Sequence, residues 1–479
     1  MLPPNRYFLA VPPYAPGHDF TGRSIELQLL TEWSVSPENP VLVLEAIGGM
    51  GKSMLCWHWV NNAIPDLKPA WAGILWYSFY ERGADMGDFC AHALSLVTGQ
   101  QAADFKGRKT ADLAAELVPL LKNRRFLLIL DGLERVLMAY NRYDAAHIPD
   151  EDLGLSGEPL QSKAQECIRA ADSGLLRTLT RVAPTKILIS SRLMPLPFLD
   201  SRGLAGYGVA HILLKGLDPV DAESMLLRIG IKGDSGAMRE YLTKHFGCHP
   251  LIVGVVGGLI NNFRPAPGDF DLWIEHRAPE GLLTPEMDLV RCRHRILWAA
   301  FEDIGEESRT LLARIALVSE AVDYETLVEL NPRRPDRPQE VCPPDEWLLD
   351  FPEYVDEYNL NKLAYEAYLA ELTLWRGSVA FVEAEAFLRE TIRDLFSRGL
   401  LQTDPAKNKC DLHPVVRGYA VSSIADENRE GVATRVVDHF SSRQDVDFER
   451  VQNLDDIRNS LQVVRTLLHL ARTSHRGCY

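Results

Sequence analysis

An apolar run that ends in closely spaced glycines constrains the fold of this chain more than any other feature of its 479 residues. In "VLVLEAIGGMGKSMLCWHWV" (41–60), three glycines lie between the apolar run and the pair Lys52 and Ser53, after which a helical pattern begins. Glycines allow successive backbone N–H groups to turn inward without Cβ clashes, and the first turn of a helix adds partial positive charge. A lysine at this point reaches the β- and γ-phosphates of a nucleotide, and a serine hydroxyl there binds Mg²⁺. The stretch therefore predicts a strand, a phosphate-binding loop and a helix that hold ATP or ADP with Mg²⁺.

The loop reads "AIGGMGKS", with Ala46 at the position where such loops normally begin with glycine, the least demanding glycine of the motif. The alternative interpretation is a glycine-rich turn at the end of a strand that binds no ligand. We favour the phosphate loop because a second motif lies where a nucleotide site requires it. The residues predicted to contact the nucleotide from this stretch are Gly48, Gly49, Gly51, Lys52, Ser53 and Met54.

The second motif is "RRFLLILDGLERV", in which a buried strand ends at Asp131 and Glu134 follows three residues later. A carboxylate at the end of this strand holds the magnesium ion and its water shell, so we predict Ser53 and Asp131 as metal ligands. Glu134 is the candidate that orients the attacking water. Its spacing is unusual, because the residue directly after the aspartate is Gly132, which has no side chain to act as a base. The alternative is that Asp131 caps a turn and Glu134 is a surface residue.

A third apolar run, "TKILISSR", ends in Ser190, Ser191 and Arg192. An arginine at a strand end beside the nucleotide can sense the γ-phosphate. The alternative is a surface arginine that pairs with an acidic insertion at 138–172. The predicted catalytic residues are Lys52, Asp131, Glu134 and Arg192.

The order of apolar and amphipathic stretches predicts the domain organisation. Short apolar runs without polar alternation are separated by amphipathic stretches, which predicts a parallel sheet with helices on both faces. The predicted strands are 41–45, 73–78, 126–130, 186–190 and 211–214. From residue 214 the pattern is helical, so the chain should be mainly α overall. A helix, two short strands around "DPAKNK" and a second helix predict a winged-helix domain. The predicted segments are a proline-rich linker at 1–17, the α/β nucleotide-binding domain at 18–213, a helical domain at 214–285, the winged-helix domain at 286–425 with an insertion near 331–375, and a helical C-terminal segment at 426–479.

Composition narrows the choice of partners and compartment. The formal net charge of −15 disfavours non-specific binding to phosphate backbones, so we do not expect nucleic acid as a partner. None of the eight cysteines forms a CxxC pair, which argues for a reducing compartment rather than a disulfide framework or a zinc site. The N-terminus has no long apolar core, and the most apolar stretch, from Pro250, is about half a membrane span. These features predict a cytoplasmic protein with no membrane partner.

Six short stretches, in this order, resemble motifs of the STAND class of signal-transducing P-loop ATPases. More narrowly, they resemble the NLR-like NB-ARC type found in plant resistance proteins, apoptosome scaffolds and bacterial relatives. The resemblance covers about residues 18 to 425 and implies a P-loop domain followed by helical and winged-helix domains. The stretches are "FTGR" (20–23), "AIGGMGKS" (46–53), "LLILDGLE" (127–134), "LISSR" (188–192), "GCHPLIV" (247–253) and "DLHPVVR" (411–417).

The resemblance also implies roles for residues outside the loop. Phe20, Gly22 and Arg23 would lie beside the nucleotide base. Pro250 would stack near adenine, and His413 would reach the β-phosphate of bound ADP. Taken alone, Pro250 would be a proline at the start of a helix, and His413 would be an ordinary core or surface histidine.

The function that this resemblance implies is a nucleotide-operated switch with slow hydrolysis of ATP to ADP. ADP would hold the domains closed, and ATP would free them to form a homo-oligomer in defence or stress signalling, such as antiviral immunity. Family members usually carry an effector at one end and a repeat sensor at the other, whereas here about 17 residues precede the core and about 54 follow it. We therefore expect the effector and the ligand-sensing module in missing termini or in separate proteins. Two alternatives remain open: a STAND-type transcription regulator whose winged helix binds DNA, and a P-loop kinase or another NTPase with steady turnover.

Overall fold

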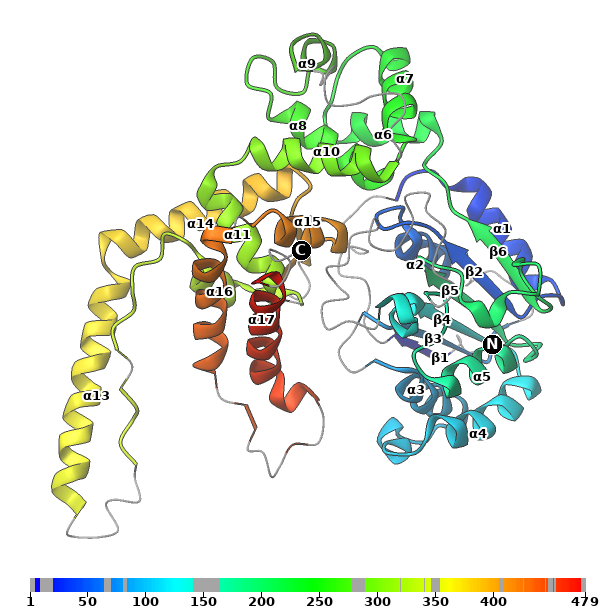
Figure 1. The fold of residues 1–479 in the computed structure, drawn as a ribbon, viewed down its shortest axis with the longest axis horizontal. Coiled ribbons are helices and arrows are strands. Elements are labelled where there is room, and N and C mark those ends of the chain that lie inside the picture. The colour runs from blue at the N-terminus through cyan, green and yellow to red at the C-terminus, as the bar shows by residue number, and fades with distance from the viewer. Residues whose placement is uncertain are drawn as a thin grey trace.

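The computed structural model describes residues 5–8, 20–63, 70–80, 84–140, 164–277, 289–318, 320–339, 341–345, 354–404, 409–424, 426–443, 445–446, 451 and 454–474. These residues form an N-terminal α/β unit, a helical unit and a C-terminal unit. In Figure 1 the α/β unit lies on the right, the helical unit at the top and the C-terminal unit on the left. Among the described residues, no helix is both long enough and apolar enough to cross a membrane.

The α/β unit is built on a sheet of six parallel strands in the order β1-β3-β4-β5-β2-β6. The strands are β1 (Asn5–Phe8), β2 (Val41–Glu45), β3 (Gly73–Ser78), β4 (Phe126–Asp131), β5 (Lys186–Ser191) and β6 (Val209–Leu213). Strands β3, β4 and β5 are buried along their whole length, which explains why the sequence shows apolar runs without alternation. Because β5 lies between β2 and β4, the ends of these three strands are neighbours at one edge of the sheet.

Strand β1 corrects the predicted linker at 1–17. Asn5 to Phe8 pair in parallel register with Gly73 to Trp76 of β3 and form an edge of the sheet. The prolines that suggested a linker flank this strand and do not interrupt it, which an edge strand tolerates. The remaining residues of the predicted linker lie outside the described ones.

Helices cover both faces of the sheet, as the sequence predicted. On one face, α3 (Met86–Thr98), α4 (Thr110–Asn123) and α5 (Ala170–Leu179) share an apolar cluster with strand residues such as Val41 and Val43. On the other face, α1 (Ser24–Val35) and α2 (Lys52–Asn62) pack against the alternate strand residues, Leu42 and Leu44 among them.

The helical unit contains α6 (Pro219–Arg228), α7 (Ser235–Phe246), α8 (Pro250–Asn261) and α9 (Phe270–Arg277). Helix α6 begins as its sequence indicates, because the Asp218 side chain accepts a hydrogen bond from the backbone N–H of Val220. The predicted boundary of this unit near residue 285 falls outside the described residues.

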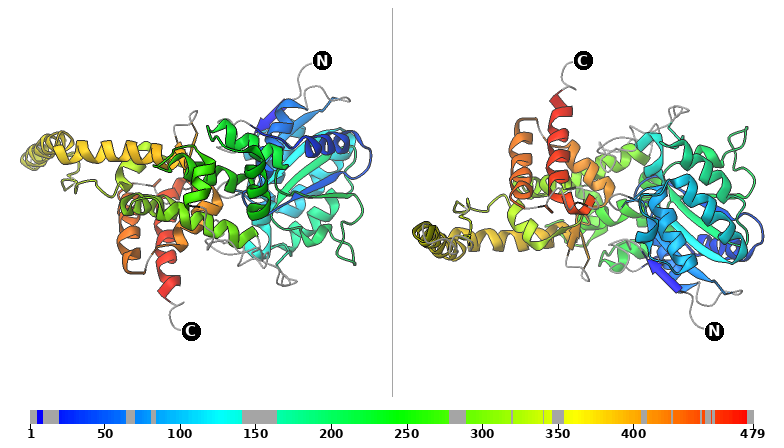
Figure 2. Two further views of the ribbon diagram at one scale, coloured as in Figure 1. Left: turned by 90° about the horizontal axis from the view of Figure 1, so that it is seen from above. Right: turned by 90° about the horizontal axis from the view of Figure 1, so that it is seen from below.

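The C-terminal unit combines helices with a small antiparallel sheet in the order β7-β9-β8. This order of elements is the one expected of a winged helix, an assignment that stays a prediction. The segment predicted as an insertion near 331–375 contains most of helix α13, which projects away from the rest of the chain in Figure 1 and is seen end-on at the far left of both views in Figure 2. The elements are α10 (Leu289–Glu302), α11 (Glu306–Leu317), β7 (Val322–Asp323), α12 (Tyr324–Leu330), α13 (Val355–Arg376), α14 (Val379–Ser397), β8 (Gln402–Asp404), β9 (Lys409–Asp411), α15 (Pro414–Ser422), α16 (Asp426–Ser441) and α17 (Arg458–Ser474).

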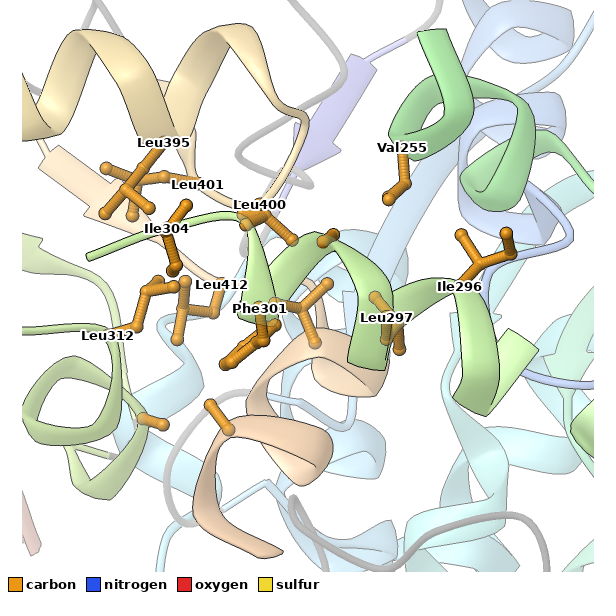
Figure 3. Packing of buried hydrophobic residues seen from close by; sticks show 14 of the residues in the cluster. Val255, Ile296, Leu297, Phe301, Ile304, Leu312, Leu395, Leu400, Leu401 and Leu412 are labelled. Carbon is orange, nitrogen blue, oxygen red and sulfur yellow. The ribbon is translucent and has the colours of Figure 1, made fainter. Parts of the chain in front are cut away.

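The helical and C-terminal units share one apolar core, part of which Figure 3 shows. The glycine-rich sequence of α8 explains how closely the units approach. A Cβ at Gly258 would lie 2.8 Å from the carbonyl oxygen of Arg398, and Gly399, with φ of +68°, lies against the backbone of Gly254. The most apolar stretch of the sequence is therefore a packing helix between two units.

Candidate nucleotide-binding site

The loop between β2 and α2 has the backbone that its glycines predict. Gly49 and Gly51 both have φ of +87°, a left-handed conformation that L side chains rarely adopt. Helix α2 begins at Lys52, so its first N–H groups face the loop. Ala46 is buried in the apolar cluster below the loop, and the position therefore accommodates a methyl group.

Lys52 is folded back over the loop. Its Nζ donates hydrogen bonds to the carbonyl oxygens of Ala46 (2.6 Å) and Ile47 (3.2 Å), and the side chain is buried. A buried ammonium group at the start of a helix concentrates positive charge in the loop, which suits a polyphosphate. Met54 follows in the first turn of α2 and is half-buried.

Asp131 and Ser53 meet as the sequence predicted. The Asp131 Oδ1 atom accepts hydrogen bonds from the hydroxyl of Ser53 (2.7 Å) and from the hydroxyl of Ser190 at the end of β5. Burial raises the pKa of Asp131, whereas the two serine hydroxyls and Lys52 oppose this rise. A buried carboxylate beside a hydroxyl fits a hard cation, so Ser53 and Asp131 would hold Mg²⁺.

Among the described residues, no group of three or more His, Cys, Asp or Glu side chains could hold a metal ion. The two predicted ligands therefore need oxygens from the nucleotide and from water to complete a magnesium shell. When bound, the ion would neutralise charge on the phosphates.

Glu134 is not a surface residue, because its side chain is 0 % exposed. It lies in the short helix Leu133–Val136, which the left-handed backbone of Gly132 turns back toward the site. Glu134 Oε1 accepts a hydrogen bond from the hydroxyl of Tyr80 (2.6 Å), and its Oε2 accepts one from the backbone N–H of Arg192 (3.3 Å). The Arg192 side chain is buried as well, and its Nε lies 3.4 Å from Glu134 Oε1. Arg192 thus lies beside another predicted catalytic residue, and most of the acidic insertion, its alternative partner, lies outside the described residues.

The "FTGR" residues join the loop to the helical unit. Arg23 is buried in a left-handed conformation, and its guanidinium donates to the carbonyl oxygens of Met50 (3.1 Å) and Gly216 (3.3 Å). Gly22, with φ of +70°, faces Asp221 at the start of α6. Phe20 stacks on the His58 ring of α2, with centroids 4.0 Å apart.

The first turn of α8 lies directly on the loop. His249 is 1 % exposed, and its Nε2 lies 3.0 Å from the carbonyl oxygen of Gly48. A Cβ at Gly49 would lie 2.7 Å from His249 Cε1 and 3.0 Å from Leu251 Cβ. Pro250 is the first residue of α8, as expected of a helix N-terminus.

The first turn of α15, in the C-terminal unit, reaches the same loop. A Cβ at Gly48 would lie 2.8 Å from Val415 Cγ2 and 3.2 Å from Arg192 Cζ. Two residues earlier, His413 caps α15, because its Nδ1 accepts a hydrogen bond from the backbone N–H of Val415 (3.2 Å). In a neutral ring this leaves the proton on Nε2, which is the form that can donate to a phosphate oxygen.

Sequence reasoning missed several residues that the structure brings to the site. Ser190 was visible in a motif but had no predicted role. His249, Leu251 and Val415 lie within quoted motifs, next to the residues that were predicted. Tyr80 had no signal beyond its place just after a predicted strand.

No protein-family model matches the chain. A search of curated proteins finds an uncharacterized WD repeat-containing protein of Nostoc sp., 23% identical over 266 residues, which are 53% of this chain and 19% of that protein. Among solved structures, the STAND protein with a tetratricopeptide repeat sensor from Pyrococcus horikoshii matches with a TM-score of 0.50 and 14% identity, over 96% of this chain and 49% of that one. The ORC1 protein of Aeropyrum pernix, solved in complex with DNA, has 14% identity over 86% of this chain and 94% of its own, with a TM-score of 0.31.

The chain thus spans about a fifth of the curated relative and about half of the STAND protein. The likeness to the STAND protein extends over nearly the whole chain, through the α/β unit and the helical units that follow it. Together with the loop geometry, it gives the chain the fold of a P-loop ATPase.

Proposed function

We propose that this chain is the core of a nucleotide-operated switch of the STAND type, close to NB-ARC proteins, that binds ATP and ADP with Mg²⁺. ADP holds the three units closed over the loop, and slow hydrolysis of ATP returns the protein to this state. Exchange of ADP for ATP opens the units and allows self-association in the cytoplasm, in defence or stress signalling.

The observation that carries the proposal is that both other units contact the backbone of the phosphate-binding loop. His249 of the helical unit bonds to the Gly48 carbonyl, and Val415 of the C-terminal unit packs against the same glycine. Arg23 bonds both to the loop and to the segment that leads into the helical unit. A change in the loop when a phosphate binds or leaves would therefore alter contacts with both units.

Such a switch requires different nucleotide affinities in its closed and open states. Moving a population from 1:99 to 99:1 takes about 5.5 kcal/mol of differential binding, whereas one hydrogen bond to a charged phosphate supplies about 1.5–3 kcal/mol. We therefore propose that a sensor contributes as well. The two similar proteins support this, since one is named for WD repeats and the other for a tetratricopeptide repeat sensor.

In the DNA-binding alternative, helix α14 would be the recognition helix, because it comes directly before the two short strands. Its charges give this alternative no support. Arg398 at its end is buried and pairs with Asp303 and Asp394. Arg389 lies 3.7 Å from Glu385 on the same helix. These pairs reduce the positive charge that α14 could offer to a phosphate backbone.

The proposal is tested by measuring nucleotide binding and size on the purified chain. ADP at a thousand times its Kd stabilises the folded state by about 4.1 kcal/mol, so the wild type should melt several degrees higher with ADP. Lys52→Ala should lose this shift, whereas Lys122→Ala, an exposed lysine of the same unit, should keep it.

Light scattering with size-exclusion chromatography then compares ADP with a non-hydrolysable ATP analogue. The analogue should give a larger or more extended species in the wild type and not in Lys52→Ala. Equal thermal shifts in both lysine variants would rule out the loop as the binding site. Identical sizes with both nucleotides, together with identical hydrogen exchange at the loop and at the first turn of α8, would rule out the switch, because nucleotide would then not shift the closed state at all.

A further inference from the structure

The Glu134 carboxylate is held from two sides. The Tyr80 hydroxyl donates to Oε1 over 2.6 Å, while Arg192 approaches with its backbone N–H at Oε2 (3.3 Å) and its Nε at Oε1 (3.4 Å). The two residues come from different elements: Tyr80 follows β3, and Arg192 follows β5. A carboxylate with donors on both oxygens has little freedom to rotate.

Tyr80 is itself fixed by its surroundings. Its ring lies over Gly132, where a Cβ would lie 2.6 Å from ring atom Cε2, and the Arg135 guanidinium lies 5.1 Å from the ring centroid. Tyr80 as a whole is 36 % exposed, but its hydroxyl is bonded to the buried Glu134 carboxylate, and desolvation there, followed by the Glu134 charge, raises the pKa of Tyr80 well above its usual value. The hydroxyl therefore stays protonated and acts as a donor.

We propose that Tyr80 is the positioning residue for Glu134 in ATP hydrolysis, an inference that rests on the proposed function. When the Arg192 side chain turns to the γ-phosphate, the Tyr80 hydroxyl keeps Oε1 in place and the Arg192 backbone N–H stays at Oε2, whose second lone pair faces the attacking water. The water oxygen forms a bond to the γ-phosphorus and its proton passes to Oε2. The bond from the γ-phosphorus to the β,γ-bridging oxygen breaks, giving ADP and inorganic phosphate.

The geometry makes Tyr80 suited to this role for a specific reason. The Arg192 Nε lies 3.4 Å from Glu134 Oε1, while its Nη2 lies beside the loop at Gly48, so a γ-phosphate bound there would attract the guanidinium away from the carboxylate. Tyr80 carries no charge that a phosphate would attract, so it remains with the carboxylate while the arginine moves. Its hydrogen bond to Glu134 is the shorter of the two side-chain contacts.

The test measures single-turnover hydrolysis and ATP binding on the purified full chain. Tyr80→Phe keeps the ring and removes the hydroxyl, so we expect kcat to fall about 10- to 100-fold. The Kd for ATP and the melting temperature should stay close to wild type. Tyr207→Phe makes the same change at an 86 % exposed tyrosine and should behave as wild type.

A double-mutant cycle separates positioning from packing. In a Glu134→Gln background, Tyr80→Phe should cause little further loss, because both changes disable the same group. Additive losses, an unchanged kcat or a raised kcat in Tyr80→Phe would each overturn the positioning role. If the wild type fails to bind ATP at all, the proposed function itself is wrong and this inference falls with it.

Discussion

Replacing His249 should open the closed arrangement without touching the phosphate cradle. The hydrogen bond between His249 Nε2 and the Gly48 carbonyl is buried and spans 201 positions of the chain. It joins two units, so it exists only while they are closed. His249→Ala removes the donor and leaves a buried carbonyl oxygen without it, which costs about 1–3 kcal/mol in the closed state. The open state has no such contact to lose.

This free-energy cost determines how much of the variant is in the open form. A loss of 1–3 kcal/mol shifts the closed-to-open equilibrium about 5- to 150-fold. If the open form is about 1% of the wild type with ADP, it becomes about 5–60% of the variant by the same relation. ADP affinity should fall accordingly, while ATP affinity should change little, because ATP is expected to favour the open form.

Isothermal titration with each nucleotide, together with hydrogen exchange of the loop and of the first turn of α8, measures this effect. His249→Gln keeps an amide donor and should restore part of the ADP affinity. His276→Ala, an exposed histidine on α9, is the matched control. The reasoning is refuted if His249→Ala lowers the melting temperature but leaves the ratio of ADP to ATP affinity unchanged, since His249 would then serve packing alone.

Two further predictions concern the C-terminal unit. His413→Ala should lower ADP affinity about 10-fold or more and leave ATP affinity nearly unchanged, because a donor to the β-phosphate would be lost only in the closed state. Titration of both nucleotides measures this, and an unchanged ratio of ADP to ATP affinity would contradict a role of His413 in binding the β-phosphate. Burial lowers the pKa of His439 to about 4, whereas an unfolded chain gives about 6.5. The neutral ring therefore contributes its full stability above about pH 6.5, and this contribution is lost as the pH falls toward about 4. Between pH 7 and pH 5 the unfolding free energy should drop by about 2 kcal/mol through this residue, and urea unfolding of His439→Gln should lack that part of the drop.

Much of the α/β unit could be predicted because its signals are local. An apolar run of five or six residues without alternation is typical of a strand in a parallel sheet whose two faces are covered, and the strands at 41–45 and 73–78 have the predicted bounds. The meeting of Ser53 with Asp131 was also predictable, since strand ends of a parallel sheet lie at one edge. The positive φ angles of Gly49 and Gly51 were predictable as well, because a loop that turns its N–H groups inward needs residues without a Cβ.

The contacts between units could not be predicted from the sequence in the same way. Nothing near His249 in the chain indicates that its ring faces Gly48, because the contact depends on how two separately folded units dock. The contact of Tyr80 could not be predicted either. Its partner Glu134 is 54 positions away, in a turn whose direction depends on the left-handed backbone of Gly132. The strand at 5–8 was missed because prolines flank it and its pairing partner is remote.

The docking also explains why two requirements meet at the same glycines. Gly49 needs its left-handed backbone to wrap a phosphate, and it also needs to lack a side chain because Leu251 lies on it. Gly48 is likewise covered by Val415. A substitution at either glycine would disturb nucleotide binding and unit closure together, and its effect could not be assigned to one of them. His249 and Val415 cover the loop from outside the phosphate cradle, so changing them alters closure while the groups that grip the phosphates remain.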